Sequence, residues 1–432
     1  MTVSVDDVAV RLERDVGASW ISVDEPMLAA HAVDGVRPRV VCRPADADQF
    51  ATVLRVCGEA GAAVTAWGGG TATGLGNVPR RVDIILRTDR LASLGEHDDA
   101  NLTATVQAGM PLGTLNARLA ARRQFLALDP PRPDEATIGG VVAANTNGPR
   151  RMSYGGVRDL VIGMRMVLAG GEQIKAGGKV VKNVAGYDMC KLFTGSLGTL
   201  GIITEVTFKM TPQPEAAATV LARGARGGAM RVVDDLFTSV LQPTAITVTN
   251  TLDGLPAGGQ AVAVAAEGFA EAVDRHLRDV QTFAAGAGMS SEVLRGSAHD
   301  ALWARLRDFP GAASQNSPAE SVIRLTVPLG TVAAALGAIE GLPGEAHWVA
   351  HAASGAVFVR VAAAGTAEAF GVLEEFARTR HGHAVLIAAP PEVKRGRDVW
   401  GQPPAALGLM REIKRQFDPH NLLNPGRFVA FL

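Results

Sequence analysis

Cysteine is scarce in this sequence, and the positions of the few that occur exclude two kinds of site. Its 432 residues include three cysteines, Cys42, Cys57 and Cys190. An odd number of widely separated cysteines forms neither a disulfide framework nor a Cys-x-x-Cys metal or iron–sulfur site. Any electrons that the chain receives must therefore leave through a group that its cysteines do not supply.

Charge of one sign and long apolar runs are also missing. The formal net charge is -1, which leaves no basic surface for nucleic acid or for an anionic membrane. No stretch stays apolar over the roughly 18 residues that a membrane span needs, and residues 1–15 resemble neither a secretory signal nor a transit peptide. We expect a cytoplasmic protein with no direct membrane insertion, whose membrane association, if any, comes through partner subunits.

What the sequence does contain is typical of a two-domain globular protein. Apolar residues make up 47% and charged residues 20% of the chain, which suits packed cores, and the length suits at least two of them. Alternating helix and strand patterns predict an α+β fold. A period-2 strand at 200–210 ends at the turn 211–214, where we place a domain boundary. The expected units are 1–37, 38–213, 214–390 and 391–432.

Local patterns place the elements within these units. Asp46 is expected to cap a helix that ends near Gly61. In the third unit the expected strands are 244–250, 260–266, 321–328, 355–363 and 384–388, and the clearest helices are 269–284, 331–340 and 366–379. A last helix with one apolar face follows residue 403, and then a turn-rich tail that must dock on another part of the protein.

A loop of five glycines, residues 68–76, follows a predicted strand in the second unit. The consecutive Gly68, Gly69 and Gly70 allow positive φ and lack Cβ atoms, so successive N–H groups can converge on a phosphate. The loop matches neither the Rossmann fingerprint nor the P-loop, because Thr73 stands at the third glycine position and no Gly-Lys-Ser/Thr follows. Taken alone, it is equally well explained as a tight turn.

Two later segments carry more information. After Pro133, small residues at nearly every second position would let a flat ligand lie against the backbone, while Thr137 and Asn145 offer hydrogen bonds. The alternative is close packing between strands. The other segment runs from 182 to 205 through a glycine-dotted loop, and either Ile202 or Ile203 can offer backbone groups to an adenine edge.

Together these three segments resemble the flavin-binding domain of the vanillyl-alcohol-oxidase family, the PCMH-type domain, in which two subdomains hold FAD. Within that family the sequence looks like the FAD-binding subunits of glycolate oxidases. That resemblance rests on the segments Thr-Ile-Gly-Gly at 137–140, Gly-Pro-Arg-Arg at 148–151, Val-Arg-Asp at 157–159, Lys-Asn-Val-Ala-Gly-Tyr-Asp at 182–188 and Asn-Pro-Gly-Arg at 424–427. It is firm over 38–213 and from about 400 to 428. The implied fold is an α+β, two-subdomain FAD domain, with an α+β cap and a C-terminal segment that returns to the FAD domain.

The resemblance also implies the cofactor contacts. The pyrophosphate would lie on Gly68, Gly69, Gly70 and Thr71. The flavin and its ribityl chain would lie along Thr137, Ile138, Gly139, Gly140, Ala144, Asn145 and Gly148, with Ile203 near the adenine and Asn424 near the isoalloxazine. Relatives that attach flavin covalently through the glycine loop have histidine there, where this chain has Trp67 and Thr71. The FAD is therefore expected to be non-covalent.

The cap departs from the pattern of active relatives. Related 2-hydroxyacid dehydrogenases carry a histidine-rich motif in this region, which this chain lacks, so we expect no metal site. His381 and His383 are interpreted as solvated turn residues, and His347 and His351 as residues of a strand. Arg324 and Arg360 could bind a substrate carboxylate, although a satisfied surface or edge position is the commoner role.

Other basic residues, Arg151, Arg158 and Lys191, could place positive charge near the flavin, but no general base can be named. Three hypotheses follow. The chain is an FAD-binding subunit that works with a catalytic flavoprotein subunit and an iron–sulfur subunit to oxidise a small 2-hydroxy acid. Alternatively it is a self-sufficient flavin dehydrogenase of another hydroxy acid or alcohol, or it is a non-catalytic scaffold.

Overall fold

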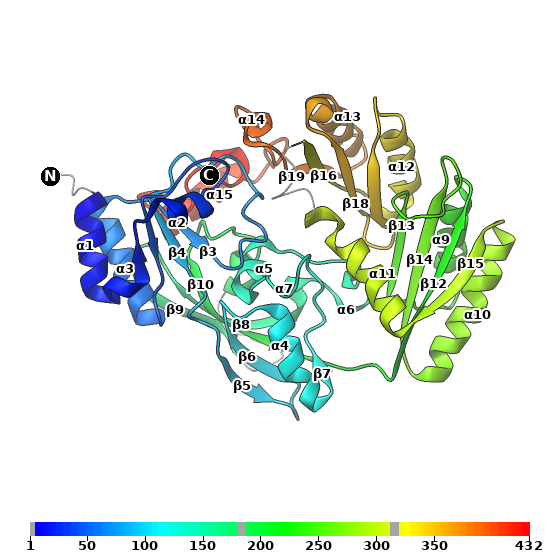
Figure 1. Ribbon diagram of the computed structural model, residues 1–432, viewed down its shortest axis with the longest axis horizontal. Coiled ribbons are helices and arrows are strands. Elements are labelled where there is room, and N and C mark those ends of the chain that lie inside the picture. The colour runs from blue at the N-terminus through cyan, green and yellow to red at the C-terminus, as the bar shows by residue number, and fades with distance from the viewer. Residues whose placement is uncertain (1–4, 179–186, 312–318) are drawn as a thin grey trace.

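The computed structural model describes residues 5–178, 187–311 and 319–432. Figure 1 shows two bodies side by side, joined by a few connections. The first contains the N-terminal half of the chain together with its last residues, and the second contains residues 216–388.

The first subdomain is a small sheet covered by two helices. Its strand order is β1-β2-β4-β3, in which β2, β4 and β3 run parallel and β1 is antiparallel. The strands are β1 (Ile21–Ser22), β2 (Val40–Cys42), β3 (Val64–Trp67) and β4 (Ile84–Arg87). Helix α3 (Ala47–Ala60) begins where Asp46 accepts a hydrogen bond from the Gln49 amide and ends at Gly61 with a φ of 65°, as predicted.

The N-terminal segment is part of this subdomain. Helix α1 (Val5–Val16) packs on α3, and its Val8 and Leu12 are fully buried in the same core. Strand β1 pairs with β2, so residues 5–37 pack against this subdomain.

The second subdomain is an antiparallel sheet with helices on one side. Its order is β5-β6-β10-β8-β9. The strands are β5 (Leu94–Asp98), β6 (Thr103–Gln107), β8 (Val161–Val167), β9 (Gln173–Gly177) and β10 (Ile202–Lys209), and the helices in its core are α4 (Leu112–Leu119), α5 (Ile138–Ala144), α7 (Val157–Leu160) and α8 (Met189–Phe193). The period-2 strand predicted at 200–210 is confirmed as β10. The strand-packing interpretation of the segment after Pro133 is wrong, because residues 138–144 form helix α5.

The cap is one eight-stranded antiparallel sheet within the described residues, in the order β15-β12-β14-β13-β17-β18-β16-β19. Its strands are β12 (Ala216–Gly224), β13 (Ala245–Thr249), β14 (Gln260–Gly268), β15 (Ser290–Arg295), β16 (Glu320–Thr326), β17 (His347–His351), β18 (Ala356–Ala362) and β19 (His383–Ala388), and its helices are α9 (Gly228–Thr238), α10 (Ala270–Gly286), α11 (Gly296–Asp308), α12 (Val332–Glu340) and α13 (Thr366–Arg378). Strand–helix–strand–strand–helix–strand occurs twice, and the two halves meet where β13 pairs with β17. The cap elements predicted from the sequence are all present, whereas β12, β15, α9 and α11 were missed.

The two faces of the cap sheet have different neighbours. Ile323 and Leu325 of β16 pack into the core made with α9, α10, α12 and α13. Since side chains alternate along a strand, Arg324 belongs to the opposite face. Figure 1 shows α11 on that face, between the sheet and the first body.

The C-terminal segment returns to the first body (red in Figure 1). It contains α14 (Pro391–Lys394) and α15 (Leu407–Phe417). Beyond them Leu423 forms a bridge with Val64 of β3 and is fully buried in the first subdomain's core. No described helix combines the length and the apolar character that crossing a membrane requires.

Candidate functional site

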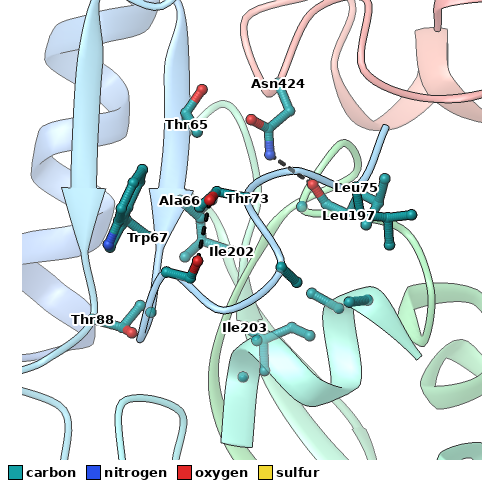
Figure 2. Close-up of a pocket in the computed structure, with 18 of the residues that line it drawn as sticks. Thr65, Ala66, Trp67, Thr73, Leu75, Thr88, Leu197, Ile202, Ile203 and Asn424 are labelled. Atoms are coloured by element: carbon teal, nitrogen blue, oxygen red, sulfur yellow. Dashed lines mark hydrogen bonds between the residues drawn. The ribbon is translucent and has the colours of Figure 1, made fainter. Parts of the chain in front are cut away.

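The glycine loop lies in a cleft between the two subdomains of the first body (Figure 2). The loop leaves β3 and faces the start of α5 and the start of β10. Nine of the predicted site residues line this cleft: Gly68, Gly69, Gly70, Thr71, Gly139, Gly140, Ala144, Ile203 and Asn424. The structure therefore brings together four segments that are far apart in the sequence.

Two of the loop glycines are required by the close approach of the loop to α5. A Cβ on Gly68 would lie 2.1 Å from the Thr137 hydroxyl oxygen, and one on Gly69 would lie 1.7 Å from the Glu135 carbonyl oxygen. Gly70 has a φ of 74°, a conformation that favours glycine. The loop is thus a shaped wall of the cleft rather than only a tight turn.

Three buried polar atoms in the cleft lack a hydrogen-bond partner among the described residues. They are the hydroxyl oxygens of Thr65 and Thr88 and the Oδ1 atom of Asn424. The Asn424 amide nitrogen donates to the Leu197 carbonyl over 2.6 Å, which leaves its oxygen free to accept. Because buried polar groups are normally satisfied, the cleft fits a ligand that carries hydrogen-bonding groups.

The remaining predicted residues have other places. Thr137 caps α5 by accepting from the Gly140 amide, and Ile138 is fully buried with its amide bonded to the Met110 carbonyl. Neither side chain lines the cleft. Asn145 and Gly148 line a second cavity instead.

This second cavity lies between the first body and the cap and measures about 540 Å³. It adjoins the cleft, since both are lined by the same five residues, Thr71, Ala72, Leu75, Gly140 and Ala144. A ligand lying in the cleft can therefore extend into a chamber covered by the cap. Asn424 lines the cleft beside Leu197 and does not line the chamber.

The chamber is cationic. Arg324 and Arg151 line it, and no hydrogen bond or ion pair holds either side chain among the described residues; the Nε atom of Arg324 is buried without a partner. A third arginine, Arg307, is paired with Asp308 over 2.8 Å. No aspartate or glutamate is among the described residues that line the chamber. This arrangement selects an anion.

The comparison of Arg324 with Arg360 shows that the two cap arginines have different roles. Arg360 donates to the Phe309 carbonyl over 2.8 Å and lies over the Phe309 ring. It also forms an ion pair with Glu320 over 3.7 Å, so although its Nε atom makes no hydrogen bond, Arg360 is held by structural partners, as the commoner interpretation holds. For Arg324 that interpretation is wrong, because its guanidinium faces the chamber unpaired.

Two histidines of the chamber were missed as site residues. Burial lowers the pKa of His351 to about 4, and its Nδ1 atom lies 3.2 Å from the Thr247 hydroxyl. Burial and the neighbouring Arg324 lower the pKa of His383. His383 is exposed, as is His381, but it begins strand β19 rather than lying in a turn, and it lines the chamber. The sequence could have indicated His351, because strand alternation places it on the same face of the cap sheet as Arg324.

Of the basic residues considered for the flavin, only Arg151 lines the chamber. Arg158 is exposed, and Lys191 pairs with Asp188 over 2.9 Å at the surface. The motif at 182–186 lies outside the described residues, and Tyr187, which follows it, is exposed.

Comparison with known proteins identifies the family of the chain. The family described as an FAD binding domain matches residues 38–177, and the C-terminal domain of FAD linked oxidases matches residues 401–428. The glycolate oxidase subunit GlcD of Bacillus subtilis is 30% identical, with 91% of this chain and 89% of that protein aligned. The chain belongs to the FAD-linked oxidoreductase family. Its cofactor is FAD, and it is an enzyme of the oxidase and dehydrogenase type.

Other relatives cover parts of the chain. The glycolate oxidase subunit GlcE of Escherichia coli is 43% identical over 29% of this chain and 36% of its own length. A D-lactate dehydrogenase of Archaeoglobus fulgidus is 36% identical over 44% of this chain and 41% of its own length. Among solved structures, p-cresol methylhydroxylase with bound substrate superposes with a TM-score of 0.73 at 16% identity, over 98% of this chain and 96% of that one. That likeness shows that this FAD-linked oxidoreductase has the PCMH-type fold.

Proposed function

We propose that this chain is the FAD-binding subunit of a complex that oxidises glycolate or a related 2-hydroxy acid and passes the electrons to an iron–sulfur subunit. The observation that carries the proposal is the unpaired Arg324 in a cationic chamber that adjoins the cofactor cleft. The names of the relatives support the same substrate class, because glycolate and D-lactate are both 2-hydroxy acids.

In this proposal the cleft holds FAD. Gly68, Gly69, Gly70 and Thr71 lie along the pyrophosphate, and Gly139, Gly140, Ala144, Asn145 and Gly148 follow the path toward the chamber. Thr137 and Ile138 do not line the cleft; they hold the first turn of α5, whose glycines face the cofactor. Ile203 contacts the adenine through its backbone, and the free Oδ1 atom of Asn424 accepts a hydrogen bond from the cofactor. The described residues that line the cleft include no histidine, tyrosine or cysteine, which supports non-covalent binding.

The cap residues hold the substrate. Arg324 and Arg151 bind the carboxylate by charge-assisted hydrogen bonds, which orients the carbon that carries the hydroxyl group. FAD, when bound, supplies the acceptor for the two electrons and the hydrogen that leave this carbon. The hydroxyl proton needs a base, and of the two chamber histidines His383 is the better candidate, because burial lowers the pKa of His351 to about 4.

The electrons then need an exit. Cys42, Cys57 and Cys190 are buried and free, and no described group of His, Cys, Asp and Glu residues is arranged to hold a metal ion. A partner with an iron–sulfur cluster fits this requirement. The relatives named as glycolate oxidase subunits support a complex that also contains a catalytic flavoprotein subunit.

The test has two steps. The purified chain is precipitated with acid, and yellow colour in the supernatant is expected for non-covalent FAD. The chain alone and the purified complex are then each mixed with glycolate, D-lactate or D-2-hydroxyglutarate in the absence of oxygen. Flavin absorbance is followed in both samples. Bleaching by a 2-hydroxy acid only in the complex supports the proposal. Turnover by the chain alone with a dye acceptor favours the self-sufficient dehydrogenase, and no bleaching in either sample favours the scaffold.

A further inference from the structure

A buried ionic cluster binds residues 73–77, at the C-terminal end of the glycine loop. Asp34 comes from the N-terminal segment, Lys394 from α14 and Arg427 from the C-terminal tail. The Asp34 carboxylate accepts from Lys394 Nζ over 2.8 Å and from Arg427 Nη1 over 2.8 Å. The side chains of all three are at most 6% exposed.

The two cations of this cluster point at the loop backbone. Arg427 donates to the carbonyl oxygens of Thr73 over 2.6 Å and Asn77 over 3.1 Å, and also to that of Leu75. Lys394 donates to the carbonyl oxygens of Gly74 and Gly76. Every carbonyl from residue 73 to 77 therefore accepts a hydrogen bond from one of two side chains.

Simple attachment of the C-terminal segment does not explain this cluster. The segment is already held by the bridge between Val64 and Leu423 and by Lys414, which donates to the Thr199 carbonyl of the FAD domain over 2.9 Å. Buried charges are costly, and apolar side chains would attach a tail at least as well. What the cations add is a fixed direction for five consecutive peptide groups.

The loop needs such a constraint. Gly74 and Gly76 give it wide backbone freedom, and Gly76 has a φ of 103°. A Cβ on Gly76 would lie 2.6 Å from the Arg427 carbonyl oxygen, so the tail is in direct contact with the loop. Arg427 also lines the cofactor cleft, which connects the cluster to the wall formed by residues 68–73.

We propose that Asp34, Lys394 and Arg427 are positioning residues that preorganise the glycine loop for FAD, so that cofactor affinity depends on docking of the C-terminal segment. This inference rests on the proposed placement of FAD in the cleft. The three residues act by fixing the loop backbone. A loop that is already ordered loses less conformational entropy when FAD binds, so FAD binds more tightly.

The test compares Arg427→Lys and Asp34→Asn with Arg415→Lys, an exposed change on α15. Lysine at 427 keeps the charge and the Asp34 partner, but its compact ammonium cannot reproduce the planar fork that reaches Thr73, Leu75 and Asn77. We expect FAD, titrated into apoprotein by fluorescence quenching, to bind at least tenfold more weakly to Arg427→Lys and Asp34→Asn. In Arg427→Lys, amide exchange at 73–77 should accelerate while that of the cap strands stays unchanged. Arg415→Lys should match the wild type in both measurements.

A purely structural role would give a different result, in which Arg427→Lys retains wild-type FAD affinity whether or not its unfolding midpoint falls. An FAD dissociation constant within twofold of wild type overturns the inference and leaves the proposed function intact, whereas failure of the wild type to bind FAD overturns both. If Asp34→Asn does not fold, the wild type alone is informative. FAD should slow amide exchange at 73–77 and at 424–428 together, and protection confined to 68–72 overturns the coupling.

Discussion

Tyr154 of α6 (Arg151–Tyr154) donates its hydroxyl hydrogen to the Glu267 carboxylate over 2.7 Å and thereby joins the FAD domain to strand β14 of the cap. Arg150 pairs with the other oxygen of Glu267 over 2.8 Å. The Glu267 side chain is 2% exposed, so this junction between the two bodies is shielded from water. It lies beside the chamber, which Arg151 and Met152 of the same helix line.

The first prediction concerns this junction. Tyr154→Phe removes the hydroxyl and leaves one carboxylate oxygen of Glu267 without its donor, which should cost about 1–3 kcal/mol of unfolding free energy. Urea unfolding measures the loss. The chain has two tyrosines, and Tyr187→Phe is the matched control because that side chain is 93% exposed. Equal stability of the two variants would show that the Tyr154 hydrogen bond contributes nothing to stability.

The second prediction concerns the carboxylate of the substrate. Arg324→Met should raise the substrate concentration for half-maximal flavin reduction by roughly tenfold to a hundredfold, since a hydrogen bond to a charged group contributes about 1.5–3 kcal/mol. Arg324→Lys should lose less, and the FAD dissociation constant should stay unchanged. Arg378→Met, on the exposed face of α13, is the control. An unaltered concentration dependence in Arg324→Met would remove Arg324 from the substrate site.

The third prediction concerns loop sterics. Gly69→Ala forces a methyl group against the Glu135 carbonyl, and backbone on both sides must move. We expect the purified variant to carry little FAD and to bind it at least tenfold more weakly. Gly371→Ala in α13 meets no atom within 4 Å and should load FAD normally. Full loading of Gly69→Ala would mean that the loop tolerates displacement from α5.

Much of the fold was accessible from the sequence because its signals are local. Asp46 and Gly61 mark the two ends of α3, and the alternation through Val206 and Phe208 marks β10. Helix α5 was harder, since its first turn, Ile138 to Val141, contains two glycines, which weaken any helical signal. The missed strand β15 is exposed along most of its length, so it lacks an apolar pattern.

The site could be predicted only where backbone shape defines it. Glycine clusters revealed the cleft, because missing Cβ atoms are visible in a sequence. The chamber depends on which face of a strand meets another domain, and nothing local distinguishes the unpaired Arg324 from Arg360, which pairs with Glu320 and the Phe309 carbonyl. The Asp34–Arg427 pair spans nearly the whole chain, and such distant partners leave no periodic signal.

The fourth prediction uses the buried His351. Its pKa is lowered to about 4 by burial, against an ordinary value of 6.5. The unfolded chain therefore binds this proton first, so stability should fall as the pH falls from about 6.5 to 4, by up to about 3 kcal/mol. His351→Gln has no imidazole at this position and therefore lacks this pH-dependent contribution to stability. The unfolding free energy of wild type should drop relative to His351→Gln over this range, and parallel pH profiles would contradict the burial of a neutral imidazole.

The fifth prediction concerns Asp129, which should make the protein less stable as the pH rises rather than as it falls. Asp129 is buried and accepts from the amides of Gly148 and Arg150 over 2.9 and 3.0 Å, yet burial raises its pKa from 3.8 to about 6. The folded chain keeps this proton longer than the unfolded chain, so the contribution of Asp129 to stability should decrease as the pH rises from about 4 to 6, by about 3 kcal/mol.

Asp129→Asn isolates this term. The variant loses a fixed amount of unfolding free energy at every pH, because its amide NH₂ group faces the Arg150 N–H. It has no charge to bury, so this loss does not change with pH. Unfolding free energies measured at intervals from pH 4 to 7 should therefore show wild type losing stability relative to Asp129→Asn as the pH rises. A constant difference would mean that the two backbone amides stabilise the carboxylate as well as water does. Because Gly148 lines the chamber, the same titration should alter how the 148–150 turn presents Arg151 to the substrate.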